Sequence, residues 1–183
     1  MRRIFIGTLV VLTIALINGC ANRKITRVDP NETIDLSGRW NDSDSRLVSE
    51  EMIGDLLTSA WIPRYLKAND KRPVVVVGLV ENKSHEHINS ETFIKDVEKA
   101  IIRDGNIRLV VAGEKRNELR KERAEQQDYA SPETTKKWGK ELGADFILQG
   151  TINSIVDSYK KQKVVTYQID LQLTNIETNE VVW

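Results

Sequence analysis

The 183-residue sequence is poorest in cysteine, with a single copy at position 20. A chain with one thiol can form no internal disulfide and no cysteine-rich metal or redox centre. Histidine is nearly as rare, with two copies, and aromatic residues make up only 6%. The sequence also has no excess of positive or negative charge, because 27 basic residues balance 27 acidic ones. Since nucleic-acid-binding domains normally carry a basic excess, this balance argues against a nucleic-acid partner.

A hydrophobic run long enough to span a bilayer as a helix is absent as well. The run Ile4–Ile17 has 14 uncharged residues and follows Arg2 and Arg3. A membrane-spanning helix needs roughly 20 apolar residues, whereas a shorter run behind basic residues is typical of an export signal. We therefore interpret residues 1–19 as a signal peptide.

The end of this signal explains the lone cysteine. Residues 16–20 read LINGC, with the small Gly19 directly before Cys20. This pentapeptide resembles the lipobox of bacterial lipoproteins, which implies that the Cys20 thiol is lipidated and becomes the new N-terminus. Ala21 stands where an Asp would favour retention in the inner membrane, so the resemblance implies the periplasmic face of the outer membrane. The alternative is an ordinary signal peptide with a chance cysteine.

The rest of the chain divides into a tether and one domain. Residues 20–42 are polar and without periodicity, which predicts a lipidated cysteine followed by a flexible tether. Residues 43–183 predict a single periplasmic α+β domain, a mixed β-sheet packed by helices, and we expect it to be a monomer. The final strand breaks off at Trp183, so we expect that the natural C-terminus lies beyond it. Apolar spacing predicts helices over 43–60 and 90–104, a further turn over 64–68, and strands over 73–80, 107–112, 146–159, 164–176 and 180–183. Pairs of opposite charge predict an exposed helix over 114–127, and a Ser-Pro start with a glycine stop predicts a helix over 131–143.

Catalytic and metal-binding constellations are not recognisable. The sequence has no Gly-x-Ser-x-Gly elbow, Walker loop or dinucleotide-binding glycine motif. His85 and His87 could share one metal ion, but no third ligand is marked by spacing, so solvated loop histidines are favoured. Glu50 and Glu51 are adjacent helix residues that cannot face each other across a cleft, so they are read as exposed charges. We expect no enzyme activity, no metal and no cofactor.

Aromatic residues on the predicted helices leave two interpretations open. Trp61, Tyr65 and Trp138 could form stacking platforms for glycans, or they could pack in the core. Their helical spacing favours core packing.

Several segments together resemble a known family. They are the lipobox at Cys20, the strand 74–80 with its exit ENKS, the segment GADFILQG at 143–150, and residues 166–183. These resemble the LpoB-type penicillin-binding protein activators, whose fold is related to the curli-secretion lipoprotein and the N-terminal domain of TolB. The resemblance implies a non-catalytic outer-membrane lipoprotein that binds and stimulates a bifunctional peptidoglycan synthase, a class A penicillin-binding protein. The short tether, without a proline-rich run, departs from the enterobacterial form.

The predicted strands carry candidate contacts for such a partner. Polar residues alternate with apolar ones along both long C-terminal strands, which places them on one face of the sheet. Two alternatives remain, namely ordinary solvated positions or positions beneath a helix. A second functional hypothesis is a structural subunit of an outer-membrane secretion or envelope complex, like the curli lipoprotein. The candidate partner-binding residues are Gln149, Thr151, Gln168, Asp170 and Gln172.

Overall fold

The structure is a computed structural model that describes residues 29, 32, 35, 37–136 and 141–183. Cys20, the signal and most of the predicted tether lie outside these residues. The chain divides into two units, Met1–Glu32 and Thr33–Trp183, of which the second contains the fold described below. In the described part of the chain, no helix has the length and apolar character needed to cross a bilayer.

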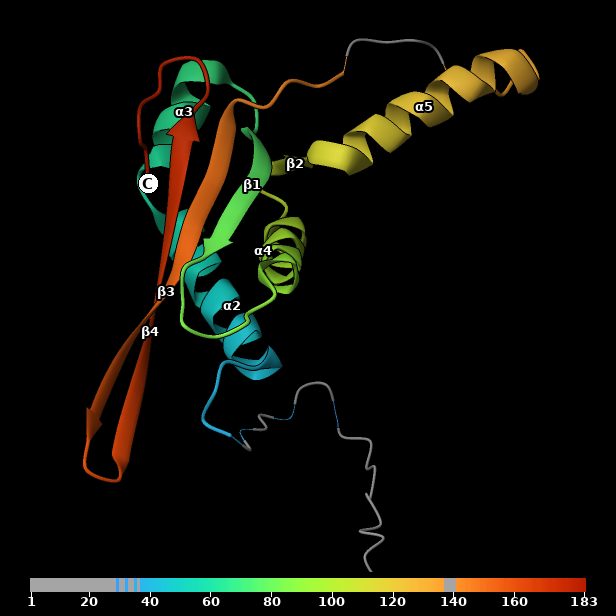
Figure 1. Cartoon of the computed structure of the whole chain (residues 1–183). Coiled ribbons are helices and arrows are strands. Elements are labelled where there is room, and N and C mark those ends of the chain that lie inside the picture. Colours follow the sequence, from blue (N-terminus) through green and yellow to red (C-terminus); the bar gives the residue numbers. More distant parts are fainter. Residues whose placement is uncertain (1–28, 30–31, 33–34, 36, 137–140) are drawn as a thin grey trace, which may run out of the picture. The chain divides into compact units, whose positions relative to one another are not determined.

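The second unit is a four-stranded mixed sheet with helices against it (Figure 1). The strands lie in the order β2-β1-β3-β4, with β1 parallel to both β2 and β3, and β3 antiparallel to β4. This arrangement confirms the predicted α+β class. In chain order the elements are α2 (Asp42–Thr58), α3 (Trp61–Asn69), β1 (Val74–Asn82), α4 (Ser90–Asp104), β2 (Arg108–Val110), α5 (Gly113–Tyr129), β3 (Phe146–Tyr159) and β4 (Gln162–Asn175).

Local sequence signals explain where the helices begin and end. The Asn41 side chain accepts hydrogen bonds from the backbone N–H groups of Ser43 and Asp44, and Asp44 accepts from the Asn41 backbone in return. This capping box satisfies backbone donors that the first turn leaves unpaired. Gly105 ends α4 with a φ of 79°, a conformation that glycine adopts without strain. The predicted bounds of α4 are confirmed.

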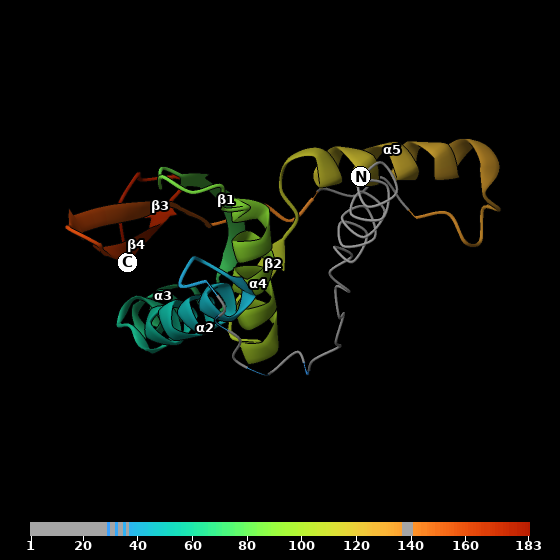
Figure 2. The same cartoon turned by 60° about the horizontal axis from the view of Figure 1, so that its bottom comes forward.

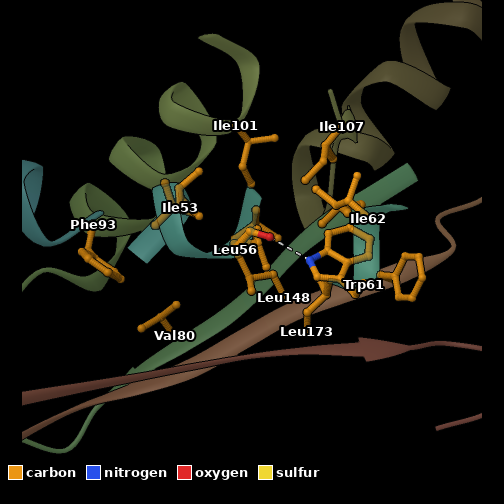
Figure 3. Close-up of a cluster of buried hydrophobic side chains, with 14 of the residues drawn as sticks. Ile53, Leu56, Trp61, Ile62, Val80, Phe93, Ile101, Ile107, Leu148 and Leu173 are labelled. Atoms are coloured by element: carbon orange, nitrogen blue, oxygen red, sulfur yellow. Dashed lines mark hydrogen bonds between the residues drawn. The ribbon is translucent and has the colours of Figure 1, made fainter. Parts of the chain in front are cut away.

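The core lies between one face of the sheet and the three helices α2, α3 and α4 (Figures 1 and 2). Figure 3 shows Leu56, Phe93, Ile101, Leu148 and Leu173 in this layer, each with no exposed surface. Burying one such side chain contributes about 1.5–3 kcal/mol. All buried hydrophobic residues of the described chain lie between Ile53 and Leu173, so residues 33–183 contain a complete core of their own.

Aromatic side chains pack against one another at both ends of the core. Trp61 donates its indole N–H to the Leu56 carbonyl over 2.9 Å, the dashed line in Figure 3, and its ring lies 5.2 Å from that of Phe146. Tyr65 packs edge-on against the same Phe146 ring. The interpretation of Trp61 and Tyr65 as packing residues is confirmed, whereas Trp138 lies outside the described residues. At the other end Trp40 packs edge-on against Phe93 and Tyr167, so the packed domain includes Trp40.

The helix predicted over 131–143 is wrong in its first six residues. Residues 131–136 form a single turn, in which the backbone N–H groups of Thr134 and Thr135 both donate to the Ser131 carbonyl. The Thr135 hydroxyl also donates to this carbonyl over 2.8 Å. Hydroxyl side chains that bond to nearby backbone compete with helix formation, and β-branched threonine adds to the penalty. Ser131 and Pro132, a pair that favours the start of a helix, therefore begin a turn here.

The strands differ from their predicted form in smaller ways. Val74–Val77 are buried on both faces as predicted, but Leu79 is 66% exposed. The pairing of β1 with β3 shifts register between Val77 and Val80, and this irregularity turns Leu79 outward. The predicted strand 107–112 shortens to three residues. The predicted strand 180–183 is reduced to a bridge between Val181 and Thr174 and backbone hydrogen bonds to Leu173 and Asn175.

Candidate protein-binding face

The five predicted contact residues lie together on one face of the sheet. The antiparallel register places Gln149 opposite Gln172 and Thr151 opposite Asp170. Gln168 lies opposite Asn153, one pair further along. Residues directly opposite each other on antiparallel strands share a face. Their sequence neighbours Leu148, Ile152 and Leu173 point into the helix-covered core, so this polar face is the other side of the sheet.

These residues are available to a partner. Gln149, Gln168, Asp170 and Gln172 are exposed, and Thr151 is half-buried. The alternative that they lie beneath a helix of the described chain is therefore excluded. We call the set Gln149, Thr151, Asn153, Gln168, Asp170 and Gln172 the polar ladder.

Side-chain hydrogen bonds organise the polar ladder around one carboxylate. The Gln168 amide donates to both Asp170 oxygens at 3.1 Å, and the Asn153 amide donates to Asp170 Oδ2 at 3.2 Å. The Asn153 amide also donates to the Thr151 hydroxyl at 3.0 Å. Asp170, the only charged member of the ladder, is thus held across two strands. Asn153 was missed by the sequence analysis, although the two-residue period from Gln149 through Thr151 leads directly to it.

A glycine sets the close approach of the two strands beneath the ladder. A Cβ atom on Gly150 would lie 2.1 Å from the Asp170 carbonyl oxygen and 2.6 Å from Leu171 Cδ2. No real side chain tolerates such contacts, so any residue larger than glycine would push β4 away from β3. Gly150 therefore fixes the backbone position of Asp170. It belongs to the segment 143–150 that carried the family resemblance.

Asp145, in the same segment, has a structural role. One of its carboxylate oxygens accepts the backbone N–H of Val74 at 2.9 Å, and its own N–H donates to the Val74 carbonyl. Lys71 lies 3.4 Å from the other oxygen, and Tyr65 is a neighbour. Burial alone would raise the pKa of Asp145, but Tyr65, the Val74 N–H and Lys71 together lower it below 3.8. Asp145 thus ties the start of β3 to the start of β1.

The two histidines lie in the loop after β1 and are exposed. His85 Nδ1 lies 2.6 Å from the Ser154 hydroxyl, and His85 Nε2 lies 3.6 Å from the Glu86 carboxylate. Glu86 in turn accepts a hydrogen bond from the Tyr167 hydroxyl at 2.8 Å. These contacts hold the loop against the sheet. Within the described ranges, no three His, Cys, Asp or Glu side chains are arranged to hold a metal ion.

The adjacent glutamates Glu50 and Glu51 are exposed on α2. Glu50 forms ion pairs with Arg46 at 3.8 Å and Arg103 at 3.3 Å. Exposed pairs of this kind contribute little to stability. The reading of Glu50 and Glu51 as exposed helix charges is confirmed.

Comparison with known proteins identifies the family. The sequence model of the family described as peptidoglycan-synthase activator LpoB matches residues 44–183. The chain belongs to the LpoB family. No curated protein sequence matches the chain.

Solved LpoB structures are similar to this chain at low identity. The LpoB C-terminal domain from Escherichia coli is 17% identical, with a TM-score of 0.42, and the match covers 76% of this chain and 93% of that one. The corresponding domain from Salmonella enterica is also 17% identical, with a TM-score of 0.36 and coverages of 67% and 87%. The NMR structure of E. coli LpoB is 13% identical, with a TM-score of 0.36 and coverages of 67% and 59%.

Membership in the LpoB family assigns a role to the domain. The family is one of activators of peptidoglycan synthases, so the chain is a regulator of cell-wall synthesis and not an enzyme. LpoB proteins are lipoproteins of the cell envelope. Residues 74–84, 143–150 and 166–183 predicted membership of this family, and the match confirms it.

Proposed function

We propose that this LpoB-family protein is an outer-membrane lipoprotein, acylated at Cys20, that binds a class A penicillin-binding protein through the polar ladder. Binding stimulates both the glycan-polymerising and the crosslinking activity of that synthase. We choose the polar ladder as the docking surface because its side chains are exposed and are held by hydrogen bonds around Asp170. The family assignment supports a synthase as the partner.

Activation requires a contact that discriminates between two states of the synthase. A binding protein shifts its partner's equilibrium only by binding the active state more tightly than the inactive one. Directional hydrogen bonds serve this purpose, because their strength depends on the exact placement of the partner's groups. The ladder side chains already hold one another in position, so little of their conformational entropy remains to be lost on docking.

The predicted anchor sets where this contact takes place. The packed domain begins at Trp40, which leaves residues 21–39 as the proposed tether. A flexible tether of about 20 residues has a root-mean-square reach of roughly 25 Å. Confinement to this distance raises the effective concentration of the domain near its membrane. The proposed contact therefore forms close to that membrane.

The test uses residues 33–183 and a purified class A penicillin-binding protein from the same organism. The wild-type domain is expected to raise the rate of glycan polymerisation from lipid-linked precursor. Asp170→Lys reverses the charge at the centre of the ladder and should abolish most of this stimulation while leaving the melting temperature nearly unchanged. Asp128→Lys makes the same change on the exposed surface of α5 and is the matched control. Equal stimulation by both variants would remove the ladder as the docking surface.

Acylation is tested separately in cells. Radioactive palmitate should label the wild-type chain and leave the Cys20→Ser chain unlabelled. Fractionation should place the labelled chain with the outer membrane. An unlabelled wild-type chain, or one recovered in the soluble fraction, would contradict the proposed anchor.

A further inference from the structure

The hairpin of β3 and β4 extends beyond the rest of the sheet. The last β3 residue paired with β1 is Ile152, and beyond it β3 pairs with β4 alone as far as Tyr159 and Gln162 (Figure 1). We call residues 155–166 the hairpin arm. Every residue of the arm is exposed except Val165, which is half-buried. The arm therefore contributes almost nothing to the core, so burial in the core does not explain why this segment forms a ribbon.

The composition of the hairpin arm is unusual for a surface in water. Four large apolar side chains stand out of it: Ile155 at 60% exposure, Val156 at 42%, Tyr159 at 70% and Val164 at 61%. They occur on both faces of the ribbon, because Ile155 and Val156 are sequence neighbours on one strand. A group of exposed apolar side chains on a β-ribbon marks an interaction site or an aggregation liability.

Positive charge is concentrated at the tip of the arm, next to Tyr159 and Val164. Lys160, Lys161 and Lys163 lie at or beside the turn, and Asp157 is the only acidic residue of the arm. The Lys160 ammonium lies 5.2 Å from the centre of the Tyr159 ring. Tyrosine beside lysine is the combination found where a protein meets a lipid headgroup layer, since both side chains have an apolar body and a polar end. The charge of the tip complements an anionic surface.

The arm starts where the chain enters the domain. Trp40 packs on Tyr167, with ring centres 5.5 Å apart, and its backbone N–H donates to the Tyr167 hydroxyl. Tyr167 is the residue that follows the arm on β4. From there to the turn, the strand rises by roughly 20 Å at about 3.3 Å per residue. This length is close to the roughly 25 Å reach of the proposed tether, so a tethered domain can bring the arm to the bilayer that holds its anchor.

We propose that the hairpin arm binds the anionic surface of the membrane that carries the lipid anchor. Tyr159 and the neighbouring β-branched side chains enter the headgroup region, and the three lysines pair with lipid phosphates. The contact holds the domain against the bilayer and leaves the polar ladder free for the synthase. This inference rests on the proposed anchoring, because the acyl chain supplies the membrane that the arm then contacts.

The test measures binding of residues 33–183, which lack the anchor, to vesicles in a sedimentation assay. Vesicles of phosphatidylglycerol and phosphatidylethanolamine should bind the domain, and high salt should release it. Vesicles of phosphatidylcholine alone should not bind. Since each basic residue near an anionic surface contributes roughly fivefold to partitioning, replacing all three lysines of the arm by Gln should lower binding at least tenfold. Tyr159→Ser should weaken binding to the anionic vesicles at low salt, because it removes apolar contact.

A matched control separates the arm from general charge. Lys67, Lys121 and Lys136 are exposed on the same unit but outside the arm, and replacing them by Gln makes the same change in net charge. This control should bind anionic vesicles like the wild type. Equal loss in both triple variants, or no binding of the wild-type domain to anionic vesicles, would overturn the proposal.

Synthase stimulation without vesicles distinguishes this proposal from the proposed function. The arm variant should stimulate the synthase as well as the wild type does. Loss of stimulation in the arm variant, together with unchanged vesicle binding, would mean that the arm contacts a protein and would overturn the membrane proposal. Vesicle binding by a domain that stimulates no synthase would support the arm proposal and contradict the proposed function.

Discussion

The two faces of the β3–β4 ribbon share one backbone but differ in the burial and polarity of their side chains. On one face Leu148, Ile152 and Leu173 are fully buried beneath the helices, and on the other Gln149, Asp170 and Gln172 are exposed. Alternation by a single residue assigns neighbours in the sequence to opposite environments. The apolar face supplies stability and the polar face supplies hydrogen-bonding groups for a partner. Substitutions of adjacent residues therefore separate the two contributions.

The largest effect is expected from truncating a side chain on the apolar face. Leu148→Ala removes a fully buried side chain and leaves a cavity, which should lower the free energy of unfolding by about 2–5 kcal/mol. Urea denaturation of residues 33–183 measures this change. Gln149→Ala, one residue further on, is the control and should change stability by less than about 0.5 kcal/mol. Comparable losses from the two substitutions would contradict the assignment of faces.

A smaller effect is expected from Asp145, which precedes the ribbon and joins it to β1. Asp145→Asn should lower the free energy of unfolding by about 1–2 kcal/mol at neutral pH, because it removes a charged acceptor from the Val74 N–H. The folded-state pKa of Asp145 lies below 3.8, so its charge stabilises the fold above that pH.

This contribution disappears as the pH falls through the lowered folded-state pKa. The wild-type domain should therefore lose more stability than Asp145→Asn when it is acidified from pH 5 to below 3.8. Thermal melts of both proteins across this range measure the difference. Parallel pH profiles for the two proteins would show that the carboxylate does not act as described.

The sequence was sufficient to predict the elements whose signals are local. The strict alternation of residues 164–176 predicted both the strand and the polar face, and Gly105 marked the end of α4. The turn at 131–136 could not be predicted in this way, because the Ser-Pro start signal was outweighed by hydroxyl groups that bond back to the Ser131 carbonyl. Local signals compete there, and their balance depends on the energies of several weak bonds.

Features that depend on register between distant segments were also beyond the sequence. The exposure of Leu79 follows from a shift in the pairing of β1 with β3, which no pattern within residues 74–82 reveals. The bond from Asn153 to Asp170, which joins the two strands of the ladder, requires the register that places Asn153 opposite Gln168. This register cannot be counted from residue patterns, although the alternation of polar and apolar residues places each residue on its strand.

The smallest change in stability, with a measurable change in function, is expected from Asn153→Ala. The substitution removes the amide that links Thr151 to Asp170 across the two strands and leaves the apolar face untouched. Stability should change by less than about 0.5 kcal/mol, since Asn153 contributes nothing to the core. Stimulation of the synthase at limiting domain concentration should fall about two- to fivefold, because Asp170 is then held by Gln168 alone and loses more conformational freedom on docking. Thr166→Ala is the control, an exposed position on the same face but within the hairpin arm, and it should stimulate like the wild type. If Asn153→Ala also stimulates like the wild type, the internal bonds of the ladder do not prepare it for the partner, and Asp170 acts through its charge alone.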